Sequence, residues 1–390
     1  MTTHIVTTWC TRDRLVFGMC PPFLLLAAAI LEGIHPYSDR LAGWPFLTSL
    51  LFIGLPHGAA DLLVSARLNR ATNWRESLGY FSGYSSLMLV VIAAIVITPL
   101  GSIIAFAMFS AWHFGAADSA DVNEYAGETP RAGSFTIAAR GVLIVALPFM
   151  SQTASSLEIV DRLLQLFGSA LASHDQWIIR TTSACLVVVA LLILTAAIAR
   201  CLVRGNIRVA GIEVFETGSI LAAFMVLHPL FAMGLYFLVW HSWRHTRRVI
   251  LLLDEQRAAS LGALARLHLR ALPLLVPTLA GVVAVLWWRL PWPTAFDVSI
   301  VALAVFVVVT PPHHFLVERL HGRDWLGLPG MSSVSDQPAR RKMRAGQQSG
   351  HSPGITAPSA GRSHECGTSG KPGSTPPRRP SFAFRKAPTR

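Results

Sequence analysis

The chain has 390 residues, of which 52% are hydrophobic and 14% charged, and its formal net charge is +12. Soluble domains carry about 25% charged residues, so this composition excludes a soluble domain of substantial size. The basic charge comes mainly from arginines at the ends of apolar segments or near the C-terminus. That placement favours a role in membrane topology and gives no reason to expect a nucleic-acid partner.

Apolar segments of roughly 15–25 residues recur along the chain, and this length crosses the hydrocarbon core of a bilayer as a helix. The ten predicted spans are 15–33, 43–66, 80–98, 101–118, 134–150, 177–200, 214–228, 229–252, 268–288 and 297–319. Very short turns join the third span to the fourth and the seventh to the eighth. Each pair is expected to form a helical hairpin, and the second pair could instead be one kinked helix. We therefore predict an all-α, polytopic transmembrane bundle of about 8–10 helices.

Arginines cluster before the first span and after the second, sixth, eighth and tenth spans. They include Arg12, Arg14, Arg67, Arg70, Arg75, Arg200, Arg204, Arg208, Arg244, Arg247, Arg248, Arg319 and Arg323. Cytoplasmic ends of spans carry an excess of arginine and lysine. The pattern therefore predicts a multi-pass protein of the cell inner (plasma) membrane with both termini in the cytoplasm.

The composition changes near the end of the last span. Residues 1–325 are predicted to form the membrane-embedded catalytic domain, whereas 326–390 are rich in serine, proline, glycine and arginine. Such a segment buries too little apolar surface to offset its conformational entropy. We expect it to be a disordered, basic cytoplasmic tail.

Histidines occur in the later part of four predicted spans, the second, fourth, eighth and tenth, that share one direction through the membrane, and those of the tenth are His313 and His314. His57 lies in the second span, His113 in the fourth, and His241 and His245 in the eighth. The last two are four residues apart and so leave the same helix face. A shared depth is what a metal centre between bundle helices requires. These four residues are the predicted metal ligands.

The donor type leaves the metal open, because imidazole suits zinc, copper, iron and nickel. A purely structural zinc site without cysteine would be unusual, and four nitrogen ligands with open positions suit Fe(2+) and dioxygen. Metal-bound imidazoles are commonly held by a second hydrogen bond. The candidates for such supporting roles are Asp61, Asp118, His313 and His314.

Three motifs carry a resemblance to a known family. Residues 56–61 (PHGAAD), 110–115 (SAWHFG) and 240–245 (WHSWRH) resemble the Brp/Blh family of membrane β-carotene 15,15′-dioxygenases, and the similarity extends over roughly 40–320. One departure is visible: Ala116 and Ala117 stand where the family has an acidic residue, whose place Asp118 could take.

The resemblance implies a non-haem iron dioxygenase. It would bind Fe(2+) through the four histidines and take β-carotene or a related carotenoid from membrane lipid. With O2 it would cleave the central 15,15′ double bond into two molecules of all-trans-retinal. A functional link to a retinal-binding rhodopsin is implied as well. Aromatic residues near the histidines are candidates for a substrate tunnel, although each could equally serve helix packing. These residues are Trp112, Phe114, Tyr236, Phe237 and Trp240.

Other classes of membrane protein are alternatives to this function. The predicted spans contain no lysine, which excludes a retinal Schiff base, and a membrane di-iron enzyme would need more histidine boxes. A b-type haem protein remains open, with paired histidines as axial ligands. A transporter or a non-catalytic assembly factor also remains open. An acidic residue in the middle of a span would favour a transporter, and the predicted boundaries place none there.

Overall fold

The computed structural model describes residues 13–61, 63, 64, 74–126, 133–254, 261–289 and 294–320. The chain divides into two units, Met1–Asp336 and Gln337–Arg390, and all described residues belong to the first. Every described secondary-structure element is a helix, which confirms the all-α prediction. The predicted tail, 326–390, lies outside the described residues, and its disorder stays a prediction.

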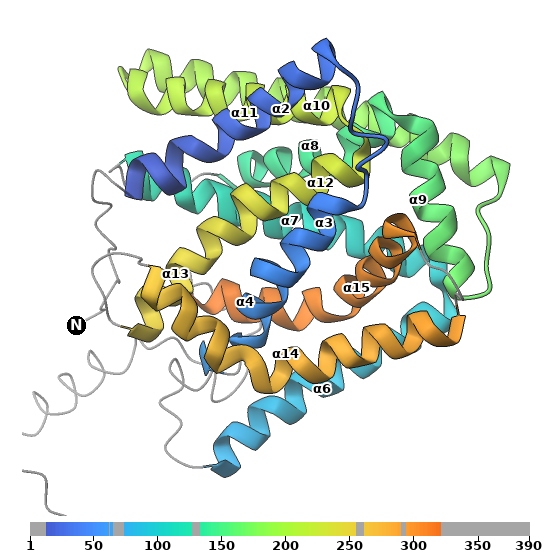
Figure 1. Cartoon of the computed structure of the whole chain (residues 1–390). Helices are drawn as coiled ribbons and strands as arrows, with labels where there is room; N and C mark the ends of the chain where they lie inside the picture. Colours follow the sequence, from blue (N-terminus) through green and yellow to red (C-terminus); the bar gives the residue numbers. More distant parts are fainter. Residues whose placement is uncertain are drawn as a thin grey trace, which may run out of the picture. The chain divides into compact units, whose positions relative to one another are not determined.

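Figure 1 shows the arrangement of the described helices. In chain order they are η1 (Arg14–Met19), α2 (Cys20–Ile34), α3 (Trp44–Ser49), η2 (Leu50–Gly54), α4 (Leu55–Ala59), α6 (Trp74–Ile97), α7 (Pro99–Ala126), α8 (Ser134–Ser151), α9 (Thr153–Leu166), α10 (Ser173–Val203), α11 (Ile207–Val226), α12 (Pro229–Tyr236), η3 (Phe237–His241), α13 (Ser242–Asp254), α14 (Leu261–Arg289) and α15 (Ala295–Leu320). The three η segments are π-helical turns.

Helix covers most of each of the ten predicted spans, and residues 62, 65 and 66 of the second span lie outside the described residues. Six helices among the described residues are long and apolar enough to cross a membrane: Arg14–Ile34, Pro99–Val122, Ser134–Ser151, Ser173–Val203, Ile207–Val226 and Ala295–Leu316. Trp44–Gly54 and Phe81–Ile97 are apolar but shorter. By helix length and composition the chain is therefore a multi-pass membrane protein.

The seventh and eighth predicted spans form two helices rather than one kinked helix. Leu227 and His228 are extended between α11 and α12, with ψ of 150° and 135°. Pro229 then begins α12 at a position where its missing N–H costs nothing. The His228 side chain accepts a hydrogen bond from the Leu230 N–H at 3.3 Å, which caps the new helix.

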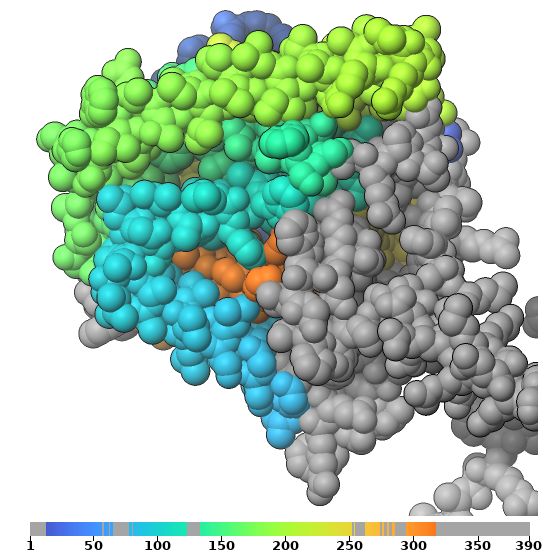
Figure 2. All heavy atoms as spheres, turned by 180° about the vertical axis from the view of Figure 1, so that it is seen from behind, coloured from blue at the N-terminus to red at the C-terminus, as the bar shows by residue number. Residues whose placement is uncertain are grey.

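Helices α7 and α8 pack with their backbones in close contact. A Cβ atom at Gly141 would lie 1.5 Å from the Ala111 carbonyl oxygen, and one at Gly115 would lie 1.9 Å from that of Ile137. Small residues permit such an approach between membrane helices. This packing fixes the position of α7, the helix that carries His113. Seen from behind, atoms of α15 are visible between α6 and α7 (Figure 2).

A buried ionic network joins α8, α11 and α13, and it corrects two predictions. The predicted seventh span, 214–228, left no acidic residue in its middle, but α11 begins at Ile207, so the fully buried carboxylate of Glu216 lies in mid-helix. It accepts hydrogen bonds from Arg140 at 3.2 Å and from Arg244 at 2.7 Å. Arg244 was interpreted as a charge at a solvated helix end, yet it is only 1% exposed. Buried charges need such partners. Because two arginines pair with Glu216, the ion pairs account for this acidic residue in mid-helix, and it does not by itself favour a transporter.

Arg247 and Arg248, also interpreted as flanking charges, are likewise paired. Arg247 bonds to Asp13 at 3.0 Å and Arg248 to Asp121 at 2.5 Å. These contacts join α13 to the start of the described chain and to α7. The arginines of α13 therefore hold that helix, which carries His245, in a fixed orientation.

Candidate metal centre

Five histidine side chains from four helical elements lie close together in the interior. His113 comes from α7, His241 from η3, His245 from α13, and His313 and His314 from α15, and each is between 3% and 7% exposed. The ring of His113 lies 4.9 Å from that of His241, 5.5 Å from that of His313 and 5.2 Å from that of His314, measured between centroids. The rings of His245 and His313 are 5.3 Å apart. His113 and His313 therefore each contact more than one other imidazole ring.

Irregular helix precedes two of the predicted ligands. The π-helical turn η3 ends at His241, and η2 ends just before α4, which contains His57. A π-turn inserts one residue into a helix and is frequent at functional sites. The backbone of His57 belongs to α4, but its side chain is not among those that the structure describes.

His314 supports His113. Their Nδ1 atoms are 3.1 Å apart, so one ring donates and the other accepts. The ring of His314 also packs against Phe109 with centroids 4.4 Å apart. A hydrogen bond at Nδ1 fixes the orientation of His113 and leaves its Nε2 for another role.

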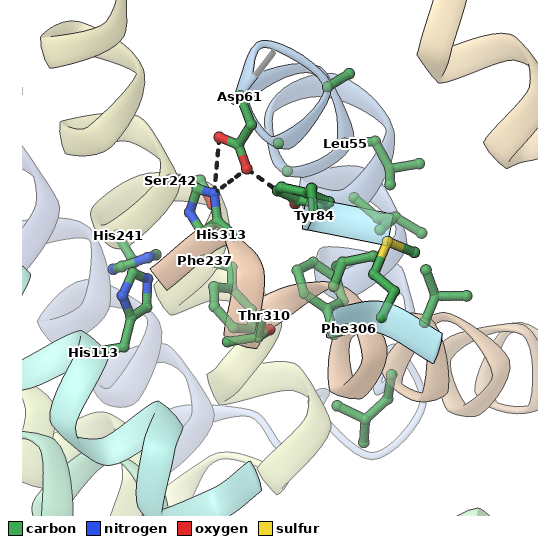
Figure 3. Close-up of a pocket in the computed structure, with 18 of the residues that line it drawn as sticks. Leu55, Asp61, Tyr84, His113, Phe237, His241, Ser242, Phe306, Thr310 and His313 are labelled. Carbon is green, nitrogen blue, oxygen red and sulfur yellow. Dashed lines mark hydrogen bonds and ion pairs between the residues drawn. The ribbon is translucent and has the colours of Figure 1, made fainter. Parts of the chain in front are cut away.

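Asp61 contacts a histidine that is distant in the sequence, and the side chain of its predicted partner His57 is not described. Four residues after His57, it was a candidate partner for a metal-bound imidazole. In the structure its two oxygens lie 3.0 and 2.8 Å from Nδ1 of His313, and Tyr84 donates its hydroxyl to Oδ2 at 3.0 Å. Figure 3 shows these contacts beside the cavity. No motif or spacing in the sequence pointed to Tyr84, a half-buried residue of α6.

Asp118 contacts aromatic residues instead of the described histidines. It accepts hydrogen bonds from the Tyr236 hydroxyl at 3.0 Å and from Nε1 of Trp240 at 3.1 Å. Ala116 and Ala117 are 1% and 4% exposed, so an acidic side chain at either position would be buried and would need a partner. The described contacts of Asp118 are thus those of a residue that ties α7 to α12 and η3.

The cluster suits a metal in donor type and in place. All five groups are imidazoles, and metal–nitrogen bonds of about 2.1 Å would put ring centres roughly 5 Å apart, which is close to the observed spacing. Among the described side chains, however, no three histidine, cysteine, aspartate or glutamate residues converge closely enough to hold an ion as they stand. The residues fit a nitrogen-ligated metal in donor type and ring spacing, and their nitrogen atoms would have to turn toward a common point for an ion to bind.

A cavity of about 290 Å³ extends from the cluster between α4, α6 and α15. Among its lining residues, His113, His241 and His313 lie at one end (Figure 3). Most of the rest of its wall is apolar and includes Leu55, Phe81, Met88, Phe106, Leu275, Leu303, Phe306 and Val309. Such a cavity, with a few polar groups at one point, is typical of a site for an apolar ligand.

The five aromatic tunnel candidates separate into two groups. Phe114 and Phe237 line the cavity, and the Phe237 ring stacks on that of Phe306 at 5.5 Å. Trp112, Tyr236 and Trp240 are not among the lining residues. The polar atoms of the last two bond to Asp118. Phe306, which the sequence did not single out, contributes to the wall from α15.

Comparison with known proteins points to one kind of enzyme. The family model for β-carotene 15,15′-dioxygenases matches residues 48–321. A curated relative is the probable β-carotene 15,15′-dioxygenase Blh of Halobacterium salinarum. It is 30% identical over 301 residues, which cover 71% of this chain and 85% of the relative. No solved structure matches the chain.

Proposed function

Because the chain belongs to the β-carotene 15,15′-dioxygenase (Brp/Blh) family, we propose that it cleaves β-carotene or a related carotenoid at the central double bond with Fe(2+) and O2. The observation that carries the proposal is the buried imidazole cluster at the end of an apolar cavity, within the region that the family model covers. The products would be two molecules of all-trans-retinal. The reaction needs no additional reductant, because both atoms of O2 enter the two aldehyde products. The C15=C15′ bond breaks, each carbon gains one oxygen atom, the carbons are oxidised and dioxygen is reduced.

His57, His113, His241 and His245 would hold the iron. Bound Fe(2+) supplies the activation of dioxygen that the organic substrate cannot achieve alone. The protein's own residues supply position and environment: His314 holds the ring of His113, and Phe114 packs against the ring of His241 at 4.9 Å. With these groups buried, water is kept away from the reacting double bond.

The shape of the cavity supports a lipid-derived substrate. Phe81 of α6 lines the cavity and is also 44% exposed, so the cavity reaches the surface of the bundle at this helix. The same helix exposes Leu89, Val90 and Val96, a surface suited to acyl chains. A carotenoid dissolved in the bilayer would enter from this side.

The size of the cavity bears on how the substrate binds. At about 290 Å³, it lies at the lower limit of about 300 Å³ for pockets that enclose drug-sized ligands. A forty-carbon polyene is larger than such ligands. One half of the carotenoid would therefore occupy the cavity while the rest extends past the histidines or remains toward lipid.

Coexpression in carotene-producing cells tests the reaction. We expect cells that make β-carotene to lose its orange colour and to accumulate retinal in an oxygen-dependent manner, because substrate and enzyme share the membrane. The measurement is chromatography of extracted pigments. Unchanged β-carotene in cells with normally inserted protein would contradict the proposal. Retinal formation would also support the proposed link to a rhodopsin, which needs this product as its chromophore.

We also propose that both termini lie in the cytoplasm. The arginines at 200, 204 and 208, which follow the sixth predicted span, support this orientation. The buried arginines of α13 no longer do, because ion pairs account for them. A cytoplasmic reporter fused after Arg390 should be active, and activity of a periplasmic reporter at that position would reverse the assignment.

A further inference from the structure

We propose that His313 is a fifth imidazole of the metal centre, held in position by Asp61 and Tyr84. This inference rests on the proposed function, in which four other histidines bind iron. It assigns His313 to the metal rather than to a supporting role, and it makes Asp61 and Tyr84 positioning residues. Helix α15 would then contribute directly to the site.

The hydrogen bonds of His313 determine which of its nitrogens is available. Both oxygens of Asp61 lie within 3.0 Å of Nδ1, and an ionised carboxylate only accepts hydrogen bonds. Nδ1 of His313 therefore carries the proton, and in the neutral ring the lone pair lies on Nε2. This arrangement of carboxylate, histidine and metal recurs in proteins, where the carboxylate fixes the tautomer and raises the basicity of the ligand.

The position of the ring places that lone pair at the cluster. The His313 ring contacts those of His113 and His245, with centroids 5.5 and 5.3 Å away. It also lines the cavity together with His113 and His241. In Figure 3, Asp61 lies on one side of the His313 ring, and His241 and His113 lie on the other. His314, the next residue, instead uses its Nδ1 to bond His113, so the two neighbouring histidines of α15 have different roles.

Tyr84 completes the chain of contacts from α6. Its hydroxyl donates to Oδ2 of Asp61, the oxygen that lies 2.8 Å from His313. This bond limits the rotation of the carboxylate and so fixes the ring that the carboxylate holds. Tyr84 and Asp61 also line the cavity, so a substrate lying against α6 would contact the residues that orient His313.

Metal binding by the purified full-length protein tests the assignment. Under anaerobic conditions, each variant is loaded with Fe(2+) and, in a separate sample, with Co(2+). The visible absorption of bound Co(2+) reports the number of its ligands. His313→Ala should lose most of the retained iron and change the cobalt spectrum. Asp61→Asn should weaken metal affinity by about 10–100-fold, as loss of a supporting carboxylate does elsewhere, and Tyr84→Phe should weaken it less.

His228→Ala is the matched control, because His228 is a buried histidine that caps α12 outside the cluster. It should keep the iron content and cobalt spectrum of the unmodified protein. If His313→Ala keeps both while His113→Ala loses them, the proposed function stands and His313 is not a ligand. If the unmodified protein retains neither metal, the proposed function fails together with this inference. Should His313→Ala aggregate, unchanged affinity in both Asp61→Asn and Tyr84→Phe would overturn the proposal.

Discussion

Replacement of His113 by alanine should abolish carotenoid cleavage and remove most of the bound iron. His113 contacts the rings of His241, His313 and His314 and is the central member of the described cluster. The substitution removes a proposed metal ligand and also the hydrogen-bond partner of His314, so the cluster loses a donor and the contact that orients its neighbour. Loss of a residue that only supports a metal ligand typically lowers metal affinity or activity by about 10–100-fold. Because His113 is a proposed ligand itself, we expect retinal formation to fall by at least about a hundredfold. The measurement is retinal formed per protein, with iron content determined on the same sample.

The control for this substitution is His174→Ala. His174 is an exposed residue in the first turn of α10, and its loss should leave iron and activity unchanged. Normal iron content and normal cleavage in the His113→Ala protein would show that the metal lies elsewhere. Normal iron content with lost cleavage would assign His113 to the substrate side of the site.

Replacement of Glu216 by alanine should be the most destabilising change outside the cluster. Glu216 is fully buried and bonds both Arg140 and Arg244. Its removal leaves two buried guanidinium groups without one of their anionic partners, and breaking a buried pair costs about 3–5 kcal/mol. The expected result is a lower midpoint of thermal aggregation in detergent, with less protein inserted in the membrane. Iron content should fall too, because Arg244 belongs to the helix that carries His245.

Glu158→Ala provides the comparison. Glu158 forms an ion pair with Arg162 at 3.8 Å, but both side chains are half exposed. Exposed pairs contribute about 0–1 kcal/mol, so this variant should behave like the unmodified protein. Equal thermal midpoints for the two variants would mean that the buried network does not hold the helices together.

The sequence predicted the helices well because each span is a long apolar segment, a signal that needs no knowledge of neighbours. Helix α9 was not predicted because it lacks this signal. Its buried residues Val160, Leu163 and Leu164 alternate with polar ones, so it contains no continuous apolar run. The spacing of His241 and His245 predicted two imidazoles on one helix face, and both rings are buried beside other histidine rings in the structure.

Pairings between distant residues could not be read from the sequence. Asp61 is four residues from His57, which suggested a contact within one helix, yet its described partners are His313 and Tyr84, from α15 and α6. Arg244 looked like a flanking charge because its partner Glu216 lies 28 residues away. Trp240 and Tyr236 were candidates for a tunnel wall, but both donate hydrogen bonds to Asp118. In each case the choice of partner depends on how helices pack, and local spacing carries no information about that.

Metal analysis and absorption spectroscopy of the purified full-length protein test the proposed function most directly. Three of the four predicted ligands, His113, His241 and His245, belong to the described buried cluster, and such nitrogen donors should bind close to one iron per chain, without haem. Iron added to metal-free protein should restore oxygen-dependent formation of retinal from β-carotene. Stoichiometric zinc, the Soret absorption of a bound haem, or cleavage that persists after complete removal of iron would contradict an iron-dependent dioxygenase.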